Sequence, residues 1–280
     1  MTLATGRNPG PLGIILAEIE RGEVSFPTHA DVAPRVRLAL DDPDLDLARA
    51  AQIIQAEPLL AARVVAVANS IAFNRTGARV ADVKTAVTRV GVRLLRALAT
   101  AVVMRQMAGG MRSAKFRDLA ARLWEHTAHV AALSHILAGR FVRGAAEIAL
   151  FAGMVHEVSG FYLISRNDAQ PELFAEEGAL QVMSADAVVG RAVLNGLAVP
   201  EEVVDAVSAL WQDGPQVFPP VSLGDVLRLA NGLTPILSPL QGAAPDASPL
   251  PLDPGAERQL AEILDQSSDE LEAMTAALRY

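Results

Sequence analysis

The sequence predicts an all-α protein, and three observations support that fold class. Hydrophobic residues make up 51% of the 280 residues, whereas aromatic residues make up only 4%. Small aliphatic side chains suit closely packed helices better than strands, in which aromatic and β-branched residues are enriched. The apolar residues also recur with helical spacing, and Gly and Pro separate the apolar runs. We therefore expect helices and little or no sheet.

The run 57–73 predicts a buried helix around which the N-terminal part is organised. Pro58 suits the first helical turn, because its φ is preset and a missing N–H group costs nothing there. Glu57 places negative charge near the positive end of the helix dipole. After Glu57, Arg63 is the only charge in the run. Such a helix needs neighbours on nearly every side.

Asn69 and Ser70 place polar groups at the end of this apolar run. Unpaired polar atoms would each cost about 1–3 kcal/mol if buried. We expect both side chains to bond to neighbouring backbone groups, in preference to a role in contacting a ligand, because Asn and Ser favour local backbone bonds.

Shorter elements precede this run. Residues 1–11 are rich in Gly, Pro and Thr, and we expect them to be flexible. Helices are predicted at about 12–21 and 32–40, and the second ends at the Asp-Asp-Pro break at 41–43. Asp44 is the expected N-cap of the next helix.

Two helices are predicted after the run. Asp82 is a suitable N-cap for a helix that Gly91 stops, and a second helix covers about 92–107. The Gly109-Gly110 pair then breaks the chain. We place a boundary here, so that residues 12–108 form an N-terminal helical subdomain.

The rest of the chain divides into a second helical subdomain, 112–213, and a C-terminal extension, 214–280. Helical segments are expected at about 116–141, 145–164, 171–180, 184–196 and 201–212. The extension is expected to contain a Pro-rich link (214–220), a helix (222–237), a loop with five prolines (238–254) and one helix, or two broken near Ser267-Ser268, at 256–278.

Composition excludes several function classes. The chain has no Cys, which removes disulfides, thiolate metal sites and a cysteine nucleophile. The first residues lack the apolar segment of a signal peptide, and no uninterrupted apolar run reaches the roughly 18–20 residues of a membrane span. We expect no membrane association and a cytoplasmic location.

The net charge of −8 is unevenly distributed. Residues 1–150 hold 19 Lys and Arg against 13 Asp and Glu, whereas residues 151–280 hold 5 against 19. The two halves can therefore attract each other.

Several short motifs occur in a fixed order between residues 26 and 212. They are Phe26-Pro27, Ile53-Ile54, Glu57-Pro58-Leu59, Val67-Ala68-Asn69-Ser70, Ala86, Val90-Gly91, Leu123-Trp124-Glu125-His126 and Gly153-Met154-Val155-His156-Glu157. In order and spacing they resemble the HDOD domain, the HD-related output domain of bacterial signalling proteins. The departures are mild: Glu57 stands where Asp is common, Ala30 where a second Pro is common, and Val90 where Leu is common.

The resemblance implies a fold and a function. The fold is an N-terminal helical subdomain packed on a degenerate HD-like helical bundle. HDOD proteins resemble non-catalytic signalling modules that act through protein contacts, so the implied partners are signalling proteins and no cofactor is expected. The resemblance leaves open whether the protein forms a homo-oligomer.

His126, His156 and Glu157 are the candidate metal ligands that the resemblance indicates. Catalytic HD phosphohydrolases hold a divalent metal with a His, a later His-Asp pair and a further Asp; here the pair is His-Glu. HDOD relatives often keep imidazoles at two later places, where this chain has residues 186–190 and Leu210-Trp211. We therefore expect neither a bound metal nor catalysis, and a metal-dependent phosphohydrolase is the alternative.

Asp186 and Asp205 are the two residues that could supply a last carboxylate, and their spacing selects neither. His129, His135 and His29 are expected to be structural, since partial burial or a hydrogen bond satisfies an imidazole as well as a metal does.

The segment 75–122 is the basic part of the chain, with 11 basic residues and two acidic ones. Arg89, Arg93 and Arg96 fall at i, i+4 and i+7, which predicts one shared helix face. This face is the candidate interaction surface. It could dock a partner or the acidic second half. Nucleotide or nucleic-acid binding is a further alternative, disfavoured for nucleic acid because the chain is acidic and lacks a known DNA-reading motif.

Overall fold

The computed structural model is all-α over the residues that it describes, which are 10–24, 42, 45–56, 58–74, 76–109, 111–174, 185–212, 214–240 and 252–279. No β-strand occurs in these ranges. The α-helices are α1 (Pro11–Glu20), α3 (Leu47–Gln55), α4 (Pro58–Asn69), α5 (Val83–Gly109), α6 (Ala114–Phe141), α7 (Ala146–Val155), α8 (Val158–Arg166), α10 (Asp186–Gly196), α11 (Glu201–Ser208), α12 (Leu223–Leu233), α13 (Pro254–Gln266) and α14 (Ser268–Arg279). Two short 3₁₀ helices are η2 (Pro171–Phe174) and η3 (Ala209–Trp211).

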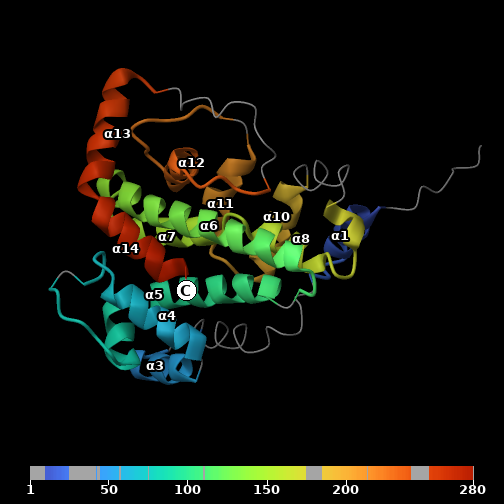
Figure 1. The fold of residues 1–280 in the computed structure, drawn as a ribbon, viewed down its shortest axis with the longest axis horizontal. Coiled ribbons are helices and arrows are strands. Elements are labelled where there is room, and N and C mark those ends of the chain that lie inside the picture. Colours follow the sequence, from blue (N-terminus) through green and yellow to red (C-terminus); the bar gives the residue numbers. More distant parts are fainter. Residues whose placement is uncertain are drawn as a thin grey trace, which may run out of the picture.

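The long helices α5 and α6 cross the middle of the molecule (Figure 1). In that view α3 and α4 lie below them, and α12 and α13 lie above. Helix α5 packs against α3 and α4 as well as α6, α7 and α8. Buried apolar side chains from before and after the predicted boundary at Gly109-Gly110 form one cluster. The division into two subdomains therefore stays a prediction.

Helix α4 is the buried helix that the sequence predicts. It begins at Pro58 and ends at Asn69. Leu60, Val64 and Val67 are each at most 1% exposed. Glu57, predicted to lie at its N-terminus, falls outside the described residues.

The polar end of α4 bonds to backbone groups. The Asn69 side chain donates to the Val80 carbonyl over 2.7 Å and accepts from the Val80 N–H over 2.9 Å. The Ser70 hydroxyl donates to the carbonyl of Val67 over 2.7 Å. Asn69 thus fastens the end of α4 to the residues just before α5.

Local signals place two helix boundaries, with one correction. Asp82 caps α5, because its carboxylate accepts from the N–H of Thr85 over 2.8 Å. The cap of α3 is Asp46 and not Asp44, since the Asp46 carboxylate accepts from the Arg49 N–H over 2.7 Å. Gly91 interrupts α5 with φ 77° and ψ 162°, a conformation that glycine adopts without strain.

The predicted helix at 145–164 is in fact two helices, α7 and α8, separated by a turn at His156 and Glu157. The His156 ring donates to the Gly153 carbonyl, an acceptor that the next helical turn would otherwise use. Gly153 also allows α7 to approach α6, because a Cβ there would lie 2.4 Å from the Cα of Ala131. This close approach brings His156 next to α6.

The segment Ala146–Arg166 is long and apolar enough to cross a membrane by length and composition alone. However, 89% of its most apolar window is buried inside the protein. Its apolar side chains therefore belong to the hydrophobic core.

The C-terminal extension packs on the rest of the chain. Helix α12 ends at Leu233 and not at 237, because Thr234 adopts an extended conformation. Helices α13 and α14 are separate and break at Ser267, near the expected place. Helix α14 contacts α4 and α6, and α12 contacts α6 and α7, so the extension touches elements on both sides of the predicted boundary.

Candidate functional site

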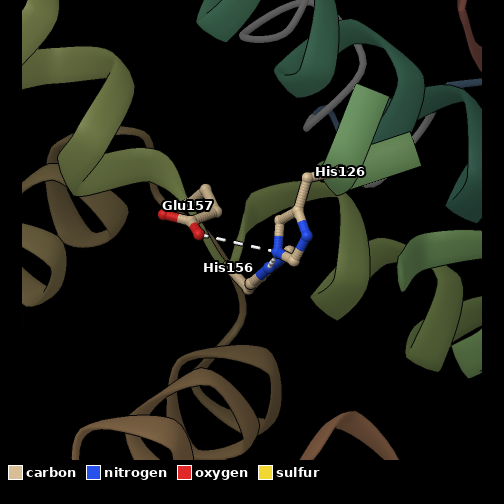
Figure 2. A group of neighbouring side chains, drawn as sticks. All are labelled: His126, His156 and Glu157. Carbon is tan, nitrogen blue, oxygen red and sulfur yellow. Dashed lines mark hydrogen bonds and ion pairs between the residues drawn. The ribbon is translucent and has the colours of Figure 1, made fainter. Parts of the chain in front are cut away.

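His126, His156 and Glu157 converge in the structure (Figure 2). His126 projects from α6, while His156 and Glu157 form the turn between α7 and α8. The two Nε2 atoms lie 3.2 Å apart, and His126 Nε2 lies 3.6 Å from Glu157 Oε1. Among the described residues this is the one cluster of three or more His, Asp or Glu side chains close enough to share a metal ion.

Backbone carbonyls fix the orientation of both rings. Nδ1 of His126 lies 2.6 Å from the Ile236 carbonyl, and Nδ1 of His156 lies 2.7 Å from the Gly153 carbonyl. A carbonyl only accepts, so each Nδ1 carries the proton. In the neutral rings both Nε2 atoms are therefore unprotonated, and their lone pairs face each other.

Burial keeps these rings neutral. Burial, together with repulsion from a charged His126, lowers the pKa of His156 to about 3. Burial likewise lowers the pKa of His126. Near pH 7 no proton is available to join the two Nε2 atoms, so their contact is a pair of facing acceptors.

These three donors fit a divalent cation. Two His nitrogens at about 2.0–2.1 Å from a zinc ion lie about 3.3 Å apart at a tetrahedral angle, close to the separation here. Metal-binding histidines also commonly donate the other ring N–H to a carbonyl or carboxylate. The cluster supplies three ligands, and a catalytic centre needs an open position for substrate beside them.

A cavity of about 180 Å³ adjoins the cluster. It is lined by His156, Glu157, Ser159, Gly160, Asp186, Leu210, Trp211, Asn231, Ser238 and Leu240. Neither Lys nor Arg occurs among these lining residues.

Two carboxylic acids face this cavity. Burial and the charge of Asp186 together raise the pKa of Glu157 to about 7, although a hydrogen bond from Ser238 acts in the opposite direction. Burial also raises the pKa of Asp186, whose carboxylate accepts from the Ser159 hydroxyl and from the Trp211 side chain. The cavity is thus acidic, and Asp186 is held by its two partners.

Of the two aspartates that could supply a further metal-binding carboxylate, only one lies near the cluster. Asp186 lines the cavity, whereas Asp205 is exposed on α11. Leu210 and Trp211 also line it, and a Cβ on Gly190 would lie 2.4 Å from the Trp211 ring. An indole therefore fills space where the resemblance leads us to expect imidazole.

The other histidines stand apart from the cluster. His129 Nδ1 lies 2.9 Å from the Thr234 hydroxyl. His135 lies against the Phe73 ring, with centroids 5.6 Å apart, and its Nδ1 is 3.9 Å from Glu270. His29 falls outside the described residues.

The prediction that Arg89, Arg93 and Arg96 share one helix face is wrong. The kink at Gly91 breaks the helical repeat between the first arginine and the other two. Arg89 instead donates to the carbonyls of Ala68 and Ala78, over 3.0 Å and 2.9 Å. It ties the end of α4 to the loop before α5.

Arg93 and Arg96 line a different cavity, of about 220 Å³, together with Glu147 and Glu202. Glu202 belongs to the acidic second half of the chain, whereas Glu147 lies in α7, near the end of the first half. This arrangement brings basic and acidic residues of the two halves to one place.

The sequence gives no sign of several residues that complete the His/Glu cluster. Ile236, Ser238 and Asn231 come from the C-terminal extension, more than 70 residues after Glu157. The Ile236 contact uses a backbone carbonyl, which leaves no signal in the residue type. Ser159 was visible only as a serine without a nucleophile motif.

A family model for the HDOD domain matches residues 26–212, which is more than half of the chain. Among the curated proteins, none matches this chain in sequence.

Three solved structures have a similar fold. One, from Shewanella amazonensis, is named a "putative metal-dependent phosphohydrolase"; it is 24% identical with a TM-score of 0.71, over 94% of this chain and 96% of that chain. An HDOD domain protein of unknown function from Geobacter sulfurreducens is 19% identical with a TM-score of 0.62, over 95% and 97%. A "putative signal transduction protein" from Marinobacter aquaeolei is 21% identical with a TM-score of 0.56, over 98% of this chain and 62% of that chain.

At these identities the three structures establish the fold alone. The matched family model, the helical fold and the place of His126, His156 and Glu157 in it agree with one another. The chain belongs to the HDOD domain family.

Proposed function

We propose that the protein is a non-catalytic regulatory module of a bacterial signalling system, located in the cytoplasm, which acts through contacts with another protein. The observation that carries the proposal is the cavity beside the His/Glu cluster. Its volume of about 180 Å³ is below the roughly 300–1,000 Å³ of typical ligand pockets. Its described lining contains two carboxylic acids and no Lys or Arg.

That lining suits phosphate poorly. Phosphoryl transfer relies on Arg, Lys or metal ions that neutralise charge on the phosphoryl oxygens. A phosphate in this cavity would face Glu157 and Asp186, and their ionised forms would repel it. The similarity of the fold to a protein named for signal transduction also supports a regulatory role.

A metal-dependent phosphohydrolase is the second candidate, favoured by the two facing Nε2 atoms and Glu157. His126, His156 and Glu157 would hold the cation, which would supply Lewis acidity and a water of lowered pKa. The Ile236 and Gly153 carbonyls would orient the rings. Similarity in fold to a protein named for this activity supports it as well.

The protein contact is proposed to involve Arg93 and Arg96. Arg93 is exposed, and each guanidinium can make forked bonds to carboxylates. The same two arginines share a cavity with Glu147 and Glu202, so a clamp between the two halves is the competing explanation.

Charge reversal separates these explanations. In Arg93→Glu/Arg96→Glu we expect the melting temperature to stay close to that of the unchanged protein, while capture of partners from native lysate falls and depends less on salt. Arg79→Glu/Lys84→Glu is the matched control, since both residues are exposed in the same basic segment. Thermal unfolding and pull-down yield are measured for all three proteins. A destabilised variant, or full retention of partners, would rule out this surface.

A further inference from the structure

A second cavity, of about 320 Å³, lies where α5, α6, α8 and α14 meet. Its lining includes Arg105, Arg117, Arg279, Trp124, Phe161 and Glu125. Three guanidinium-bearing residues and one carboxylate thus surround two aromatic rings. The volume falls within the range typical of small-molecule sites.

Arg63 adds a fourth cation behind this lining. It is 2% exposed, and none of its three side-chain nitrogens has a hydrogen-bond partner among the residues that the structure describes. Its Cζ lies 5.4 Å from the Trp124 ring centroid, and the Cζ of Arg105 lies 5.8 Å from the same centroid. Two arginines therefore lie against one indole ring.

A buried guanidinium without a carboxylate is costly, and a cation–π contact recovers only part of its lost hydration. Burial, together with the charge of Arg105, lowers the pKa of Arg63 to about 10. An anion in the adjoining cavity would offset the charge of both arginines. The unpaired Arg63 is thus an observation, separate from the cavity lining, that points to a negatively charged ligand.

The aromatic rings and guanidinium groups are held in place. The Trp124 Nε1–H donates to the Leu278 carbonyl over 2.9 Å, and the ring meets Phe161 edge-on with centroids 5.9 Å apart. Arg105 donates to the Arg279 carbonyl and Arg117 to the Met111 carbonyl, each over 2.8 Å. Because a guanidinium has five N–H groups, both arginines keep donors for a ligand.

We propose that this cavity binds a small organic phosphate that carries a planar ring, the chemistry of a nucleotide. Arginine forks match phosphate oxygens, and aromatic side chains pack against a planar ring. The site is separate from the His/Glu cluster and from Arg93 and Arg96, so the proposal does not depend on the function proposed above.

Calorimetric titration of the full chain tests the site, with adenosine monophosphate, guanosine monophosphate and inorganic phosphate as probes. We expect saturable binding of at least one nucleotide, tighter than that of phosphate alone. Arg105→Gln should weaken this binding about tenfold or more. Arg122→Gln is the matched control, because Arg122 is exposed on α6 and pairs with Asp118 outside the cavity. It should bind as the unchanged protein does.

Arg63→Met gives a second test that does not depend on Arg105. Without ligand we expect its melting temperature to be unchanged or higher, since an uncompensated buried charge is removed, while nucleotide affinity falls. The proposal is overturned if neither nucleotide binds at millimolar concentration, if phosphate binds as tightly as the nucleotides, or if Arg122→Gln loses as much affinity as Arg105→Gln. A lower melting temperature of Arg63→Met with unchanged affinity would likewise assign Arg63 a structural role alone.

Discussion

Val64→Asp is expected to unfold the helices around α4. Val64 is fully buried in the cluster that α3, α4 and α5 share, and an unpaired buried charge costs more than about 4 kcal/mol. Domain stabilities are only about 5–15 kcal/mol, so a large fraction of the structure's stability would be lost. Arg63 gives little relief, because adjacent residues of a helix do not face each other.

Thermal unfolding followed by circular dichroism measures this loss. Ala62→Asp is the control, since Ala62 is exposed on the same helix and its replacement should cost within about 1 kcal/mol. Position 67 is the less decisive choice, because a carboxylate there would lie at i+4 from Arg63 and could pair with it. An unchanged melting temperature in Val64→Asp would mean that α4 is exposed in solution.

Glu157→Gln is expected to stabilise the protein at alkaline pH. Burial raises the pKa of Glu157 from 4.5 to about 7, so between these values the folded state holds a proton that the unfolded state has released. The stability that this group contributes is present below pH 4.5 and is lost as pH rises to about 7. Above that pH the ionised, buried carboxylate costs at most about 3 kcal/mol, and a neutral amide avoids this cost.

Urea unfolding with a chelator at pH 4.5 and pH 8 tests the sign. We expect the variant to exceed the unchanged protein by about 1–3 kcal/mol at pH 8 and to match it near pH 4.5. His156 contributes with the opposite sign, because its pKa is lowered to about 3, and comparison at equal pH cancels that contribution. Glu272→Gln, at an exposed position on α14, should show no such gain. A loss of stability at pH 8 without chelator would indicate a bound cation.

Elements that follow local rules could be predicted from the sequence. The Pro58 start of α4, the Gly91 break and the Ser267 break depend on the φ preference or helix-ending tendency of a single residue, and the structure shows all three. By contrast, the turn between α7 and α8 depends on a bond from His156 to Gly153, and nothing in their spacing indicates it.

The residues of the His/Glu cluster could be predicted from the sequence, but the groups that orient them could not. The resemblance selected His126, His156 and Glu157, and the structure brings them together. The carbonyl of Ile236, which sets the tautomer of His126, lies 110 residues away in sequence. The prediction for Arg89 was wrong because it assumed one continuous helical repeat from Arg89 to Arg96, whereas the backbone is not helical at Gly91. The cavity beside Trp124 joins α5, α6, α8 and α14, and no local pattern links residues so far apart.

Metal content and phosphodiester turnover of the purified protein test the central claim most directly. Mn, Fe and Zn are quantified, and hydrolysis of bis(p-nitrophenyl) phosphate is followed with added divalent metal, in the unchanged protein and in His156→Ala. The regulatory function proposed here predicts that the unchanged protein hydrolyses the diester no faster than His156→Ala does. Stoichiometric metal together with turnover, both lost in His156→Ala, would contradict it and establish a metal-dependent phosphohydrolase.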